Sequence, residues 1–301
     1  MGKSGGKKSK KKNKKLVSTI ITVALAVFLV VGLGIMLYPS ISDWWNSMHA
    51  SRSISDYVYA VENVNNEELE RMIGVARSYN QRLAGSQHFD LSEEEYAEYE
   101  SLLDISGTGI MGYITIPSIN VNLPIYHGTE ETVLQIAAGH LAGSSLPVGG
   151  LGTHSIISGH RGLPSAKLFT DLDKLVVGDT FVISILNENL TYRVDQIKVV
   201  LPEDTSELGI SKDKDYCTLV TCTPYGINTH RMLVRGHRVE NEEEELVVII
   251  TPDASKVPNY IVAVFIIIPI LIIMTIVYMI FTAHKKRHLS TYEILDEVKT
   301  L

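Results

Sequence analysis

Three side chains in this sequence have the chemistry needed for acyl transfer. Cys222 follows the apolar, β-branched run Thr218–Thr221 and precedes Thr223-Pro224, so it lies where a strand gives way to a loop. His160 ends a similar run, and Arg231 follows Cys222 by nine residues. A thiol becomes a nucleophile when it loses its proton, and a nearby imidazole or guanidinium stabilises the thiolate. A charged arginine can also stabilise a developing oxyanion.

The pattern around Cys222 leaves other interpretations open, and from pattern alone a lone cysteine in an apolar strand is more often packed than reactive. If Cys217 and Cys222 share a strand, they lie five residues and ~16 Å apart on opposite faces, too far for a disulfide. Metal binding is poorly supported, because the sequence has neither C-x-x-C nor H-E-x-x-H. Cys217 is interpreted as a core residue.

Short β-like runs separated by Gly, Pro and Asn begin near Gly112 and must position these residues. Many short strands at this spacing predict a small closed or partly closed β-barrel. Strand ends at one rim of a barrel can bring together side chains from distant sequence. A hairpin is predicted to turn near Asn187–Asn189, and short helices are predicted at Glu131–His140 and Lys167–Leu175.

Before the barrel, apolar residues at three- and four-residue spacing predict two helices, at about 43–64 and 66–84. Asn65, followed three residues later by Glu68, is typical of a helix N-cap, and Gly85 is a plausible stop. Residues 85–112 form a polar, acidic connector.

Two uncharged segments, Leu16–Tyr38 and Tyr260–Ala283, are long enough to cross a bilayer core of about 30 Å as helices. A cleaved signal peptide is the rival for the first, but its apolar part is long and no small-x-small cleavage site follows it. Lysines precede the first segment and His284–His288 follows the second, so both termini are predicted to be cytoplasmic and residues 39–259 extracellular. The lysines are expected to contact anionic lipid.

The acidic residues gather between the two segments, which makes nucleic acid an improbable partner. The predicted organisation is a basic cytoplasmic tail (1–15), a transmembrane helix (16–38), a helical extension with a candidate lid (39–104), a catalytic β-barrel (105–240), an acidic linker (241–259), a second transmembrane helix (260–283) and a cytoplasmic tail (284–301).

The run "TLVTCTPYGINTHRMLVRGHR" (Thr218–Arg238) closely resembles the T-L-x-T-C signature of sortases, with an arginine nine residues beyond the cysteine. "GTHSIISGHRGLPSAKLFTDLDKLVVGDTF" resembles the segment around the sortase histidine, and "GYITIPSINVNLPIYH" resembles the start of the sortase barrel. The segments "CTPYGINTHR" and "GHRGLPSAKLF" most resemble those of class C, the pilin-polymerising sortases. The similarity covers about 105–240.

The resemblance implies a mainly β protein, a sortase-like closed β-barrel with short helices, acting as a cysteine transpeptidase without metal or cofactor. Cys222 would attack a Thr–Gly bond in an LPXTG-like sorting signal, His160 would be the general acid/base, and Arg231 would stabilise the oxyanion or position the substrate. A pilin lysine would resolve the thioester, so the implied partners are pilin subunits and the lipid bilayer. The alternative is a housekeeping sortase that attaches proteins to cell-wall peptidoglycan.

Class C sortases usually carry a lid ahead of the barrel, with an Asp-Pro-aromatic motif that covers the cysteine. No such tripeptide lies between Trp44 and Gly112. The nearest candidate is Phe89-Asp90 in "QHFDLSEEE", in the opposite order and without proline; the alternative is a plain linker.

Overall fold

The computed structural model describes residues 5–84, 87–241, 266–267, 269–270 and 272–277. The chain divides into two compact units, residues 1–41 with 256–301 and residues 42–255. We describe each unit by itself.

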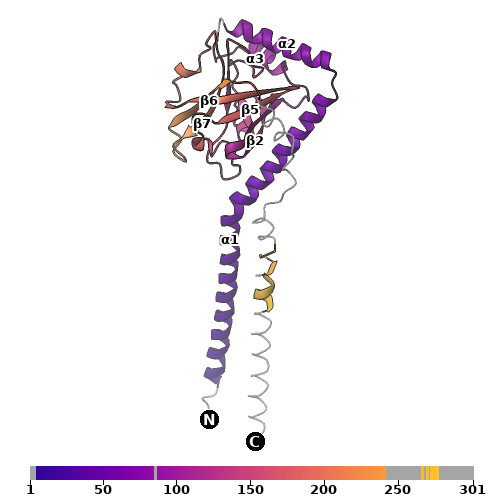
Figure 1. Ribbon diagram of the computed structural model, residues 1–301. Coiled ribbons are helices and arrows are strands. Elements are labelled where there is room, and N and C mark those ends of the chain that lie inside the picture. The colour runs from indigo at the N-terminus through magenta and orange to yellow at the C-terminus, as the bar shows by residue number, and fades with distance from the viewer. Residues whose placement is uncertain (1–4, 85–86, 242–265, 268, 271, 278–301) are drawn as a thin grey trace. The chain divides into compact units, whose positions relative to one another are not determined.

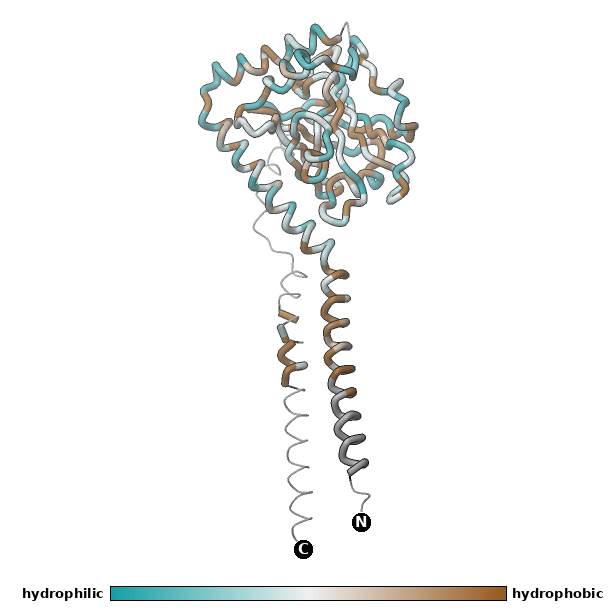
Figure 2. The backbone as a smooth tube through the Cα atoms, turned by 180° about the vertical axis from the view of Figure 1, so that it is seen from behind, coloured by the Kyte–Doolittle hydropathy of each residue, from teal (hydrophilic) through white to brown (hydrophobic). Residues whose placement is uncertain are grey.

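The first described element is one long helix, α1 (Gly5–Glu62), which runs on through the predicted first span and the helix predicted at 43–64. Pro39 lies inside α1, a position that helices tolerate near membranes. From Ile20 onward α1 is long and apolar enough to cross a membrane, and Figure 2 shows a hydrophobic stretch along this helix. Residues 266–267, 269–270 and 272–277 are helical; the rest of the predicted second span lies outside the described residues.

The second unit contains a closed barrel in the order β1-β2-β3-β4-β7-β8-β6-β5, closed by pairing of β5 with β1 (Figure 1). Its strands are β1 (Ile110–Ile116), β2 (Val121–His127), β3 (Ala138–His140), β4 (Thr153–Ser158), β5 (Thr180–Ile185), β6 (Glu188–Val200), β7 (Asp215–Thr223) and β8 (His230–Arg238). The predicted closed β-barrel is confirmed. Two of its contacts, β2 with β3 and β4 with β7, are parallel.

The two short helices predicted within the barrel sequence are much shorter than predicted. α4 covers only Glu131–Leu134, because Ala138–His140 pairs with β2 and β4 as strand β3. Within Lys167–Leu175 the only regular element is the 3-10 helix η2 (Leu172–Lys174). The other 3-10 helices are η1 (Pro117–Ile119) and η3 (Ser206–Leu208). The predicted hairpin is present, with Ile185 opposite Glu188 across a tight turn.

Helices α2 (Asn66–Leu83) and α3 (Glu93–Ser101) share one hydrophobic core with the end of α1 and the barrel. The Asn65 cap is confirmed, since its Oδ1 accepts the N–H of Glu68 at 2.8 Å. Asn80 of α2 pairs with Leu146: its Nδ2 donates to the carbonyl (2.9 Å) and its Oδ1 accepts the N–H (2.7 Å). Tyr57 of α1 likewise donates to the Met111 carbonyl at 2.9 Å. These buried hydrogen bonds fix the helices on the barrel.

A buried aromatic and imidazole cluster fixes α3. The hydroxyl of Tyr99 accepts the N–H of Gly128 and lies 3.0 Å from Nδ1 of His140. On the other side of that ring, Nε2 donates to the carbonyl of Ser145 at 2.9 Å. The Tyr99 hydroxyl donates to the carbonyl of His140 at 3.0 Å. Because the Ser145 carbonyl can only accept, Nε2 carries the hydrogen of a neutral His140 ring. Burial lowers its pKa from the ordinary 6.5 to about 3.

This depressed pKa predicts that the fold weakens in mild acid. Below pH 6.5 the unfolded chain protonates His140 whereas the folded chain does not, so stability is lost as pH falls from 6.5 towards 3. The loss attributable to this group is about 1.4 kcal/mol per pH unit. Urea unfolding of the full chain in detergent, followed by near-UV circular dichroism, measures it.

The control is His140→Gln, which keeps an amide donor for the carbonyl of Ser145 but does not titrate. We expect its stability to fall less steeply with acidification than that of the wild type. His154, whose pKa burial also lowers, is present in both proteins, so the difference in slope isolates His140. Equal slopes would contradict the prediction.

Candidate functional site

Strand pairing brings the three candidate residues to one rim of the barrel. β8 lies antiparallel to β7 with Arg231 directly opposite Cys222, which places both side chains on the same face. β4 lies parallel to β7, with Ser158 beside Val220 and the N–H of Gly159 donating to the Val220 carbonyl at 3.0 Å. Continuing that register by two residues places His160 beside Cys222. The structure thus brings together His160, Cys222 and Arg231 on neighbouring strand ends.

The approach of the His160 segment to β7 is tight. The hydroxyl of Thr221 donates to the carbonyl of Gly159 at 2.7 Å. A Cβ on Gly159 would lie 2.6 Å from the buried ring of Phe169. Only glycine lets the chain pass between Phe169 and β7 at this point, so the local sequence "SGH" is needed to bring the imidazole to the rim.

Each of the three side chains is partly accessible to solvent, as a site that receives a macromolecular substrate requires. The His160 side chain is 23% exposed, and its Nε2 lies 3.1 Å from Oε2 of Glu131. Two backbone carbonyls restrain the Arg231 side chain: its Nη1 donates to the carbonyls of Asn228 (3.3 Å) and His230 (3.2 Å). The two carbonyls therefore restrain the guanidinium of the residue that pairs with Cys222.

Arg161, next to the imidazole, links two loops of the site. Its side chain is only 8% exposed and forms an ion pair with Asp173. Its Nη1 donates to the hydroxyl of Thr223 at 3.3 Å, and its guanidinium carbon lies 6.0 Å from the ring centre of Tyr225. Arg161 therefore connects the segment after β4 to the loop that follows Cys222.

An apolar cavity of about 290 Å³ begins at Arg231 and runs along β4, β7 and β8. Its walls include Leu141, Ile156, Val200, Leu208, Val220 and Leu233. Phe89, one of the two candidate lid residues, lines the cavity and packs in the same apolar cluster. Its neighbour Asp90 is exposed. The structure therefore places Phe89, but not Asp90, among the groups that line the groove.

Hydrogen bonds of the Gln87 side chain and a close backbone contact of His88 hold the Phe89 segment on the barrel. The side-chain amide of Gln87 donates to the carbonyl of Leu208 at 3.2 Å and accepts the N–H of Ile210 at 3.1 Å. A Cβ on Gly143 would lie 2.1 Å from the carbonyl oxygen of His88, so the segment crosses the barrel loop in direct contact with its backbone. Sequence reasoning missed Gln87 because nothing in its neighbourhood distinguishes it from other surface amides.

The two cysteines differ completely in environment. Both are free, and Cys217 is fully buried in the barrel core. Burial raises the pKa of the Cys217 thiol well above its usual range, and the carboxylate of Asp215 adds to the effect. Cys217 is therefore a neutral packed thiol, and the interpretation of it as core is confirmed.

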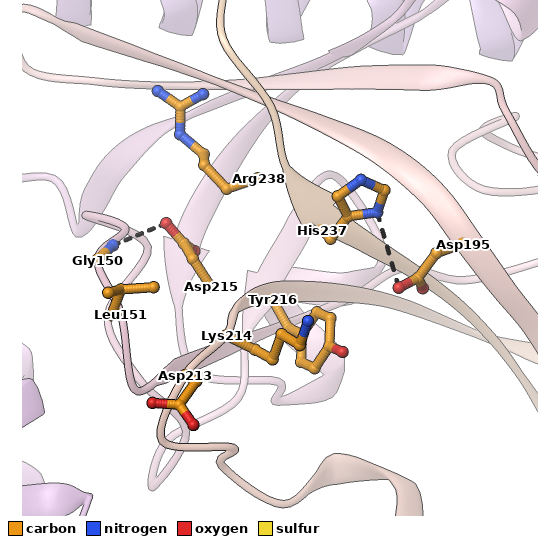
Figure 3. A pocket seen from close by; sticks show the side chains of 9 residues that line it. All are labelled: Gly150, Leu151, Asp195, Asp213, Lys214, Asp215, Tyr216, His237 and Arg238. Atoms are coloured by element: carbon orange, nitrogen blue, oxygen red, sulfur yellow. Dashed lines mark hydrogen bonds and ion pairs between the residues drawn. The ribbon is translucent and has the colours of Figure 1, made fainter.

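A second pocket, of about 700 Å³, lies at the opposite end of β7 and β8 (Figure 3). Asp215 is fully engaged there: it accepts the N–H of Gly150 at 2.7 Å and the hydroxyl of Tyr192 at 3.0 Å. On the other wall, Asp195 forms an ion pair with Arg235. The residues that line this pocket include no thiol. Among the described residues, no group of three His, Cys, Asp or Glu side chains could hold a metal ion.

Comparisons with known proteins agree with this geometry. A sortase-domain family model matches residues 114–239. The crystal structure of sortase C1 from Streptococcus agalactiae is 56% identical, with a TM-score of 0.62, and the match covers 64% of this chain and 100% of that one. Sortase C of Clostridium perfringens, solved with the C-terminal cell wall sorting motif, is 49% identical, with a TM-score of 0.56, covering 63% of this chain and 99% of that one.

Among curated proteins, Sortase D of Bacillus subtilis is 30% identical over 131 residues, which is 42% of this chain. The match spans 63% of that protein, less than two thirds of its length. In contrast, the matches to the two sortase C structures cover almost the whole length of those chains.

Proposed function

Because this chain belongs to the sortase family, we propose that it is a membrane-anchored class C sortase. In this proposal it cleaves an LPXTG-like sorting signal between Thr and Gly and transfers the acyl group to a pilin lysine amine. The observation that supports the proposal is that β7, which carries Cys222, lies between β8, where Arg231 pairs with Cys222, and β4, which ends two residues before His160.

The first half-reaction starts from a Cys222 thiolate and a His160 imidazolium. The sulfur attacks the threonine carbonyl, and the developing oxyanion is stabilised by the Arg231 guanidinium. The Thr–Gly C–N bond breaks as His160 delivers its proton to the departing glycine amine. The products are an acyl thioester on Cys222, a neutral imidazole and the released C-terminal peptide.

The second half-reaction restores the enzyme. A lysine amine of the next pilin subunit attacks the thioester, and the C–S bond breaks to regenerate the thiolate. His160 accepts the proton that the nucleophilic amine loses. The new bond is an amide between two subunits, so repeated cycles build a covalent polymer.

The likeness to class C structures favours pilin transfer over anchoring to cell-wall peptidoglycan. The helices α1 and α2 share a core with the barrel, which resembles the helical extension of that class. We also propose a two-pass arrangement with both termini cytoplasmic and the barrel extracellular, supported by the apolar length of α1 and by the basic residues that flank both apolar segments.

Incubating the full chain in detergent with pilin subunits that carry an LPXTG-type tail tests the proposal. The expected result is a covalent ladder on a denaturing gel. Replacing all accessible pilin lysines should leave the enzyme trapped as a thioester. Formation of an adduct with a peptidoglycan-type amine, and no ladder with pilin, would favour the housekeeping alternative; no adduct with either acceptor would reject both.

We further propose that Phe89 acts as the lid by occupying the apolar groove in competition with the sorting signal. Phe89→Ala is expected to raise kcat/KM for a sorting-signal peptide by about three- to tenfold, because removing a half-buried phenylalanine forgoes about half the 1.5–3 kcal/mol of its burial. Stopped-flow acylation of Cys222 measures the effect.

Two neighbouring variants serve as controls. Phe89→Leu keeps an apolar side chain in the groove and should remain close to the wild type. Asp90→Asn alters the exposed neighbour and should change nothing. If Phe89→Ala is no faster than Asp90→Asn, the segment is a linker and not a lid.

A further inference from the structure

The imidazole of His160 has a carboxylate partner that the reaction scheme above does not use. Oε2 of Glu131, the first residue of α4, lies 3.1 Å from its Nε2. The second oxygen of the same carboxylate accepts the side-chain amide of Gln135 at 3.1 Å. Contacts to two different side chains therefore fix the carboxylate, although it is largely exposed.

This contact fixes the tautomer of His160. The hydrogen bond from Gln135, and then the contact with His160, lower the pKa of Glu131, so at neutral pH its carboxylate is ionised and can only accept. Nε2 must therefore be the donor and carry a hydrogen. The ring then has only Nδ1 left to gain and lose the proton in the two half-reactions.

We propose that Glu131 is a positioning residue for acyl transfer: it holds Nε2–H of His160, so that Nδ1 alone exchanges the catalytic proton. The inference rests on the proposed function, because it requires His160 to be the acid/base. In the first half-reaction Nδ1–H gives its proton to the departing glycine amine, and in the second Nδ1 receives the proton of the lysine amine. Glu131 keeps its own charge throughout and forms no covalent bond.

Glu131 differs in this respect from the adjacent acid. The carboxylate of Glu130 accepts the hydroxyl of Tyr96 at 2.8 Å and so faces α3. The two acids share a short segment, a charge and exposure to solvent. They therefore form a matched pair in which only one contacts the imidazole.

Two measurements on the full chain in detergent test the proposal. Long-range ¹H–¹⁵N spectra of ¹⁵N-histidine protein, with His160 assigned by its loss in His160→Gln, report which ring nitrogen carries hydrogen. Measured in a Cys222→Ala background, where no thiolate holds the ring as an imidazolium, the neutral ring is expected in the Nε2–H form, and Glu130→Gln should not change it. Glu131→Gln should show a mixture of tautomers, since an amide can donate as well as accept.

Transfer kinetics supply the second readout. We expect Glu131→Gln to lower kcat by roughly two- to fivefold, the range set by an exposed charged contact, with KM for the sorting peptide unchanged. Glu131→Asp should recover part of the loss, and Glu130→Gln should match the wild type. An unchanged tautomer and kcat in Glu131→Gln would overturn the proposal. Failure of the wild type itself to transfer would instead reject the proposed function.

Discussion

The Cys222→Ala protein is expected to form no thioester with a sorting-signal peptide and to release no glycine-terminated product. Removing the nucleophile of a peptidase lowers turnover by on the order of 10⁶, which here means no measurable activity. Mass spectrometry of the full chain after incubation with peptide checks it directly. The strand arrangement also singles out Cys222. Its strand, β7, pairs with β8, which carries Arg231, and with β4, which ends just before His160.

Cys217→Ala is the matched control. It removes the other thiol of the same strand, five positions away, where the side chain is fully buried. We expect this variant to be somewhat less stable, because it leaves a small cavity, but to acylate at nearly the wild-type rate per folded molecule. An active Cys222→Ala protein, or an inactive but folded Cys217→Ala protein, would show that the nucleophile is misassigned.

Replacing Arg231 with methionine is expected to lower the acylation rate by about 10²–10³, the loss typical of removing one oxyanion donor. The side chain lies opposite the thiol and is anchored by loop carbonyls, so its charge is in place before substrate arrives. Arg231→Lys should recover only part of the rate, because an ammonium lacks the planar fork of a guanidinium. Single-turnover acylation measures both variants.

Arg235→Gln is the control for Arg231. Arg235 lies on the same strand and pairs with Asp195, far along β8 from the thiol. Its loss should affect stability and leave acylation per folded molecule unaltered. Equal losses of rate in the two variants would mean that Arg231 acts through the fold and not on the oxyanion.

The sequence anticipated the parts of the site that depend on neighbouring strands. The nine residues from Cys222 to Arg231 suit two antiparallel strands joined by a loop, and that is how β7 and β8 pair. Asn65 was recognisable as a helix cap because the capping interaction is local. The number and spacing of the strands predicted a closed or partly closed barrel, and the resemblance to sortases implied the closed form that the structure has.

Features that depend on contacts between distant segments could not be predicted. The run from Glu131 to His140 has helical spacing, but pairing of Ala138–His140 with two other strands overrides that local preference. The bond between Tyr99 and His140 joins α3 to β3 and has no local signature. Glu131 was visible only as the start of a helix, since its contact with His160 spans 29 residues.

The parallel pairing of β4 with β7 also determines when the thiol can become reactive. Sixty-two residues separate Gly159 from Thr221, which bond across this pair, and contacts this distant in sequence form late because a long loop must close first. The cysteine therefore has no neighbour from β4 until β7 has entered the barrel. In the proposed reaction, acyl transfer thus becomes possible only when the barrel is complete.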